Sequence, residues 1–147
     1  GAGAAPPVRG LRPVAAVAPG VAAATGLSLQ QLAAALVGQL RPAAVVCVDS
    51  LCSAEGQRLG RTVQFSDAGL YPAQADHTRH LTRDTLGVPV VAAGIPTLMQ
   101  AQEGADLVVT PRALDSVIAH GAALLAGSVN RALQPRLTVQ QLCWLTG

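Results

Sequence analysis

Lysine is absent from this 147-residue sequence, and aromatic residues are scarce, with one Trp, one Tyr and one Phe. All 10 basic residues are therefore arginines, which are scattered rather than gathered in a run, and the formal net charge is only +2. Direct binding of a nucleic-acid backbone requires a concentrated positive surface. The composition therefore argues against a nucleic-acid partner, and the lack of lysine is more typical of genomic base composition than of a chemical requirement.

Long uninterrupted apolar segments are also missing. Arg, Pro and Gly break each apolar run before it reaches the roughly 18 residues that a membrane-spanning helix needs. The first residues, GAGAAPPVRG, have neither an initiator Met nor the charged start of a signal peptide. We therefore expect no membrane association, and we interpret residues 1–11 as a flexible lead-in or an end introduced by cloning.

Cysteine is too rare for a disulfide framework, because there are three cysteines and the number is odd. This favours a reducing compartment. Cys47 and Cys52 lack the CxxC spacing of a zinc site, so we interpret them as small buried hydrophobic residues. The sequence predicts no metal and no cofactor.

What remains is aliphatic: half of the residues are hydrophobic, and most of these are Ala, Val and Leu. A chain of this length buries about two-thirds of its unfolded surface as one domain. We therefore predict a single domain over residues 12–147.

The spacing of apolar residues, together with Gly and Pro, predicts the elements of that domain. Strands are expected at 13–17, 43–48, 61–66, 88–93 and 106–109, and helices at 28–40, 82–86, 110–133 and 138–145. Ser28, Thr110 and Thr138 are the expected N-caps. The order strand, helix, strand at the start predicts a parallel pair, and the whole predicts an α/β fold with three layers, α/β/α, around a mostly parallel sheet.

Asp49 follows the apolar run Val45–Val48 directly. Ligands of open parallel sheets bind at the carboxyl ends of the strands, so Asp49 is a candidate catalytic or metal-binding carboxylate. Partial desolvation at this edge would raise the pKa of a carboxylate and suit it to acid–base chemistry. The alternative is that Asp49 caps the turn or helix that follows.

Asp67 and Ser66 follow the next predicted strand in the same way, and either could instead form a plain turn. Two further pairs, Pro19 with Gly20 and Gly94 with Pro96, predict turns whose backbone could approach a substrate. His77 and His80, with Asp76, could face a metal, but a solvated surface is the favoured interpretation, and His120 is favoured as a packed or surface side chain.

Several blocks of the sequence resemble the germination protease family, also called spore protease. They are RPVAAVAPGVAAATGLS (12–28), VVCVDSL (45–51), VQFSDAGLYP (63–72), LTRDTLGVPVVAAGIPT (81–97), VVTPRALDSVI (108–118) and SVNRALQP (128–135). Their order and their Pro and Gly positions make the resemblance specific. Tyr71 and Gln134 depart from it, since both stand where the family is expected to have His.

The resemblance implies an α/β fold related to hydrogenase-maturation proteases and phosphorylase-like domains. It implies an endopeptidase without a cofactor that degrades small acid-soluble spore proteins during germination. It further implies a zymogen, a homo-oligomer, and a cytoplasmic location in the forespore or spore core.

The resemblance also implies an acid-type mechanism with two aspartates, of which Asp49 is one. The other is expected in a Gly-rich segment upstream of the block that begins at Arg12, so these residues resemble the C-terminal part of the family's domain. One interpretation is a peptidase domain with Asp49 catalytic, Asp67 supporting it, and the turns at Pro19–Gly20 and Gly94–Pro96 lining the cleft. The alternatives are a catalytically incomplete homologue that serves as a binding or scaffold domain, and a metal-dependent maturation peptidase with Asp49 and a His as ligands.

Overall fold

The computed structural model describes residues 10–20, 26–71, 80–100 and 108–146. The chain forms two compact units, the larger over Ala18–Ile118 and the smaller from Gly1–Val17 together with Ala119–Gly147. Helix α4 (Leu114–Leu133) contributes residues to both. The single domain predicted for residues 12–147 stays a prediction, and most of the predicted lead-in, residues 1–9, lies outside the described part.

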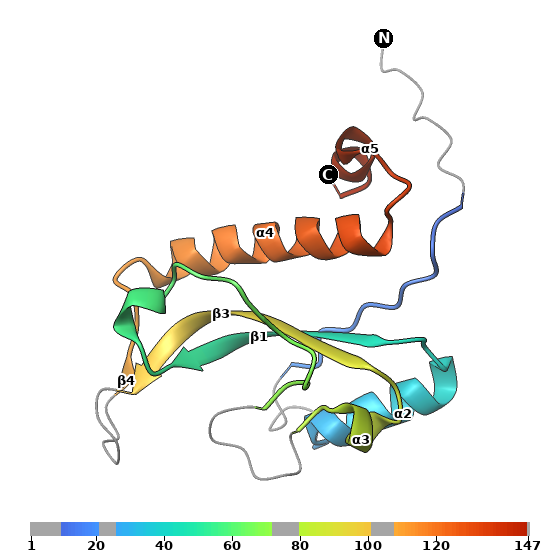
Figure 1. The fold of residues 1–147 in the computed structure, drawn as a ribbon, viewed down its shortest axis with the longest axis horizontal. Helices are drawn as coiled ribbons and strands as arrows, with labels where there is room; N and C mark the ends of the chain where they lie inside the picture. Colours follow the sequence, from blue (N-terminus) through green and yellow to red (C-terminus); the bar gives the residue numbers. More distant parts are fainter. Residues whose placement is uncertain (1–9, 21–25, 72–79, 101–107, 147) are drawn as a thin grey trace. The chain divides into compact units, whose positions relative to one another are not determined.

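The larger unit is built on a mixed sheet (Figure 1). Its strands are β1 (Val45–Ser53), β2 (Gln64–Ser66), β3 (Val90–Gln100) and β4 (Val108–Val109). Strand β3 is central: β1 pairs with it in parallel along one side, while β2 and β4 pair with it antiparallel at two places on the other side. Among the described residues, the sheet thus contains one parallel pair and two antiparallel pairs.

Strand β3 continues through Gly94–Pro96, where the sequence predicted a turn, and that prediction is wrong. Pro96 lies within the ladder with β1, opposite Leu51. Its carbonyl oxygen accepts a hydrogen bond of 2.7 Å from the Gly60 amide. The N–H and C=O groups of a strand residue point to the same side of the strand. An N–H group at Pro96 would therefore point away from β1, toward the side of β3 where β2 and β4 pair, so the proline removes no hydrogen bond from the ladder with β1.

Helix α2 (Leu29–Leu40) begins where the sequence predicted it, with Ser28 as its N-cap. The Ser28 hydroxyl accepts from the Gln31 amide at 3.1 Å, and the Gln31 side chain accepts from the Ser28 amide at 2.9 Å, which completes a capping box. The short helix α3 (Arg83–Leu86) has the same arrangement between Thr82 and Thr85. Both starts are therefore fixed by local hydrogen bonds.

One face of the sheet forms the core of this unit. Its buried members are Cys47, Leu70, Leu81, Leu86, Val90 and Ala92. Side chains of α2, among them Leu29, Ala33 and Val37, pack against this cluster, and α2 and α3 lie on the same side of the sheet (Figure 1). The three-layer, mostly parallel α/β/α arrangement stays a prediction.

The smaller unit contains residues 10–17, most of α4 and all of α5 (Val139–Thr146). Thr138 precedes α5 and accepts from the Gln141 amide at 3.2 Å, as its predicted capping role requires. Helix α4 ends at Leu133 as predicted but begins at Leu114, so Thr110 is not its N-cap, and that prediction is wrong.

Residues 13–17 form no strand, and the parallel pair predicted between them and residues 43–48 is wrong. The parallel partner of β1 is β3. Over the described ranges, no helix combines the length and the apolar character needed to cross a membrane.

Candidate active site

Asp49 is the fifth residue of the nine-residue strand β1 and has an exposed side chain. The sequence placed it at the carboxyl end of a shorter strand, and that placement is wrong, because the ladder with β3 continues for four residues beyond it. The expected partial desolvation is also wrong, because the Asp49 side chain is exposed to solvent. The Asp49 Oδ1 atom accepts a hydrogen bond of 2.8 Å from the Ser50 amide, and Asp49 caps no helix.

Gly94 is the residue of β3 that pairs with Asp49. A Cβ atom at residue 94 would overlap with the carbonyl oxygen of Asp49 and would lie 2.6 Å from the Cγ of Leu51. Only glycine lets the two strands approach this closely. The close approach at Gly94 thereby fixes the backbone that carries Asp49. The Leu51 side chain lies against Gly94.

Cys47 lies two residues before Asp49 and on the same face of β1, because strand side chains alternate. It is buried, whereas Val46 and Val48 are 40% and 56% exposed, so β1 is covered on one face rather than on both as the sequence predicted. Burial raises the pKa of the Cys47 thiol, and the negative charge of Asp49 raises it further. Cys47 is therefore held as a neutral thiol, which is unsuited to act as a nucleophile.

Ser66 and Asp67 are exposed at the end of β2. The Ser66 hydroxyl accepts a hydrogen bond of 3.2 Å from the Ala68 amide, which is the turn that the sequence allowed for. Ser66 pairs with Ala92 of β3, whereas Asp49 pairs with Gly94, two residues further along β3. Strand β3 lies between the strands of Ser66 and Asp49. Standard strand spacings put the Cα atoms of Asp49 and Ser66 about 12 Å apart, and Asp67 lies beyond Ser66, so Asp67 is not brought beside Asp49.

Gln64 is a polar residue near Asp49 that sequence reasoning missed. It pairs with Gly94 from the other side, so Asp49, Gly94 and Gln64 form one row across three strands. With a glycine in the middle of the row, Gln64 is the next side chain across from Asp49, at a Cα separation of about 10 Å. The alternation of polar and apolar residues in Val63–Ser66 was the signal that could have indicated its position.

The predicted turn at Pro19 and Gly20 is exposed, and Gly20 has a positive φ of 67°. Pro96, in contrast, is fully buried. The roles in substrate binding assigned to Pro19, Gly20, Gly94 and Pro96 stay predictions.

The metal hypothesis depended on Asp49 with a histidine. In the ranges that the structure describes, no group of three His, Cys, Asp or Glu side chains could hold a metal ion. His77 and Asp76 lie outside those ranges. His80 contacts the exposed Tyr71, with ring centroids 4.8 Å apart, next to hydrogen bonds of 2.8 and 3.0 Å between the backbones of Leu70 and Leu81.

Comparison with known proteins connects these residues to one family. A family model described as "Germination protease" matches residues 7–103, which include β1, β2 and β3. A germination protease of Clostridium perfringens is 28% identical over 180 aligned residues, covering 90% of this chain and 55% of its own length.

Two further relatives are more similar over shorter stretches. The germination protease of Halalkalibacterium halodurans is 37% identical over 113 residues, covering 76% of this chain and 29% of its own length. That of Bacillus subtilis is 38% identical over 94 residues, covering 63% of this chain and 26% of its own length. The chain thus spans about half or less of the length of these curated relatives.

Proposed function

The chain belongs to the germination protease family, and from this membership we propose that it is the part of an endopeptidase that carries one catalytic carboxylate, Asp49. The substrates we propose are small acid-soluble spore proteins, which the family resemblance implies. The location we propose is the forespore or spore core, again from the resemblance.

The observation that carries this proposal is the setting of Asp49. Its backbone is held by a nine-residue ladder to β3 and by the close approach of Gly94, so its position is rigid. Its side chain is exposed, and the hydrogen bond from the Ser50 amide engages one of the two carboxylate oxygens. A rigid backbone with an accessible carboxylate is what a catalytic acid or base requires.

A peptidase that uses neither a metal ion nor a nucleophilic side chain needs two proton-transfer groups. One group activates the attacking water, and the other protonates the leaving amine. Two carboxylates in one site divide these roles because their pKa values separate. Asp67 lies too far across the sheet to be that partner. We therefore propose that the second carboxylate belongs to the Gly-rich segment that the resemblance places upstream of the block starting at Arg12.

The experiment that tests the proposed activity is incubation of the full-length protein with a purified small acid-soluble spore protein, with new peptide ends identified by mass spectrometry. We expect cleavage at internal peptide bonds, unchanged by EDTA. Binding of the substrate without cleavage would contradict the proposal and establish the incomplete homologue. Loss of cleavage in EDTA that zinc restores would establish the metal-dependent peptidase instead.

We also propose that the protein forms a homo-oligomer, as the resemblance implies. One face of the sheet presents Val46, Val48, Phe65 and Val91, each at least 37% exposed. Exposed apolar patches of this kind are typical of association surfaces. Light scattering after size-exclusion chromatography tests this, and a monomer at every concentration would contradict it.

A further inference from the structure

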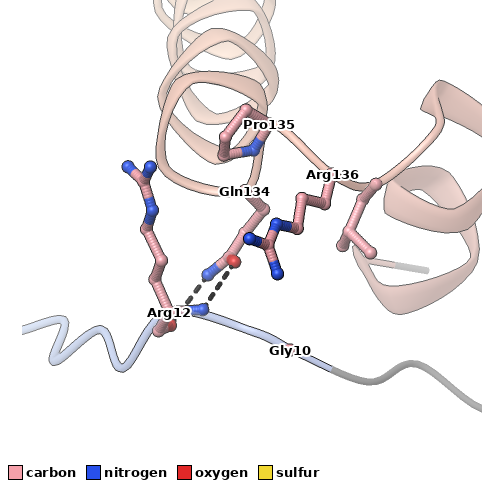
Figure 2. Close-up of a pocket in the computed structure, with 6 residues that line it drawn as sticks. Gly10, Arg12, Gln134, Pro135 and Arg136 are labelled. Atoms are coloured by element: carbon pink, nitrogen blue, oxygen red, sulfur yellow. Dashed lines mark hydrogen bonds between the residues drawn. The ribbon is translucent and has the colours of Figure 1, made fainter.

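The smaller unit contains a cavity of about 230 Å³, lined by Gly10, Arg12, Gln134, Pro135, Arg136 and Leu137 (Figure 2). It lies where the segment preceding Pro13 meets the turn that connects α4 to α5. Every residue that lines it belongs to the smaller unit, and it contains none of the residues assigned above to the Asp49 site.

The two walls of the cavity are joined by the side chain of Gln134. Its Oε1 atom accepts from the Arg12 amide at 2.8 Å, and its Nε2 atom donates to the Arg12 carbonyl oxygen at 2.9 Å. This side chain thus satisfies both backbone groups of Arg12 as a neighbouring strand would. The segment around Arg12 is held in place against the end of α4.

The turn after α4 is fixed from within. The Arg131 Nη1 atom donates to the carbonyl oxygens of Pro135 and Leu137, at 2.8 and 3.1 Å. Leu137 is buried. The backbone on this side of the cavity is therefore preorganised by hydrogen bonds within the protein.

The charged side chains of this unit are all arginines. Residues 1–17 and 119–147 contain Arg9, Arg12, Arg131 and Arg136 but neither Asp nor Glu. The Arg131 side chain donates to backbone carbonyl oxygens, which are neutral groups. In the described part of the chain, no hydrogen bond or ion pair engages the guanidinium of Arg12 or of Arg136. The two arginines that line the cavity thus have no acidic side chain within their own unit.

Arg12 and Arg136 both line the cavity. Figure 2 shows the Arg136 side chain directed toward Gln134 and the chain at Gly10, while the Arg12 side chain extends along the other side of Gln134. A Cβ atom at Gly10 would lie 3.7 Å from the Arg136 Nη1 atom, so the guanidinium rests against a residue without a side chain. The two arginines thus flank Gln134.

We propose that this cavity binds an oxyanion, the carboxylate or phosphate group of a small ligand, with Arg136 as its main contact and Arg12 as a second. The planar fork of a guanidinium matches both groups with paired N–H donors. The prearranged walls lower the cost of ordering the site on binding. The proposal is independent of the peptidase activity proposed above.

The test is a titration of the full chain followed by NMR of the arginine Nε–Hε signals. Inorganic phosphate is the probe for a phosphate group, and N-acetylglycine is the probe for a carboxylate. N-acetylglycinamide, the uncharged amide of N-acetylglycine, is the control. We expect saturable shifts of the Arg136 and Arg12 signals with at least one of the two anions and none with the amide. The anion that saturates at the lower concentration identifies the ligand class.

Matched variants decide whether the cavity is responsible. Arg136→Gln should raise the dissociation constant at least tenfold, and Arg136→Lys, which keeps the charge but loses the fork, should also raise it. Arg83→Gln, on α3 in the other unit, should leave it unchanged. Shifts that grow linearly without saturation for both anions, or equal affinity of the wild type and Arg136→Gln, would overturn the proposal.

Discussion

Asp49 on β1 and Gly94 on β3 lie opposite each other in the parallel ladder, and the carbonyl oxygen of Asp49 occupies the space that a Cβ atom at residue 94 would need. The backbone of the proposed catalytic residue can thus lie this close to β3 only because Gly94 has no side chain. Any residue other than glycine at position 94 must push β1 away or displace Leu51.

The first prediction concerns this contact. Gly94→Ala should lower the free energy of unfolding by about 1–3 kcal/mol, because the added methyl group overpacks a site made of backbone. Urea unfolding followed by circular dichroism measures this. Gly38→Ala is the matched control, since a Cβ there meets no atom within 4 Å, and it should raise the stability by about 0.5–1 kcal/mol as glycine leaves a helix interior. Equal effects of the two changes would contradict the close approach.

The second prediction concerns the start of α2. Ser28→Ala removes the hydroxyl that accepts from the Gln31 amide and should destabilise the fold by about 1 kcal/mol. Ser128→Ala, at an exposed position inside α4, removes a hydroxyl without a capping role and should change the stability by less than about 0.5 kcal/mol. If both variants unfold at the same urea concentration, the capping box makes no contribution.

The third prediction concerns the thiol of Cys47, whose pKa is raised above its ordinary value of 9.0 by burial and by Asp49. A raised pKa lowers the fraction of thiolate at a given pH, so Cys47 should react with iodoacetamide more slowly than the exposed Cys52 and Cys143. Mass spectrometry of labelled peptides across a pH series measures the three rates. Labelling of Cys47 as fast as that of Cys52 would contradict its burial.

One substitution separates the electrostatic cause of the raised Cys47 pKa from burial, and the raised pKa itself has a further consequence for stability. Asp49→Asn removes the neighbouring charge and should move the labelling profile of Cys47 to lower pH. The unfolded thiol ionises near pH 9.0 whereas the folded thiol ionises higher, so its contribution to stability is complete below pH 9.0 and is lost as the pH rises through the folded pKa. A labelling profile unaffected by Asp49→Asn would remove Asp49 from the neighbourhood of the thiol.

The sequence predicted well the features that local chemistry determines. Ser28 and Thr138 were expected as N-caps, and the helices α2 and α5 begin directly after them. Such starts depend on neighbours in the chain and need no knowledge of the fold. Thr110, expected in the same role, is not the N-cap of α4. The predicted end of this helix at residue 133, two residues before Pro135, is likewise a local signal, and it is confirmed.

Features that depend on pairing could not be predicted locally. Gly94 and Pro96 are turn residues by composition, yet β3 runs through both, because one permits a close approach to β1 and the other faces a stretch with no ladder bond to lose. The error propagated to the site: with β1 and β3 ended too early, Asp49 was expected at the edge of the sheet. Gln64 was missed because its proximity to Asp49 arises only through the antiparallel register of β2.

The most direct test of the catalytic role of Asp49 compares Asp49→Asn with Asp67→Asn in the full protein. Both substitutions replace an exposed carboxylate with an amide of the same shape, so folding is expected to be preserved in each. With a small acid-soluble spore protein as substrate, Asp49→Asn should lower kcat at least about a hundredfold with little change in KM, since a proton-transfer group is lost. Asp67→Asn should retain kcat within about threefold. Equal kcat for the wild type and Asp49→Asn would contradict the account.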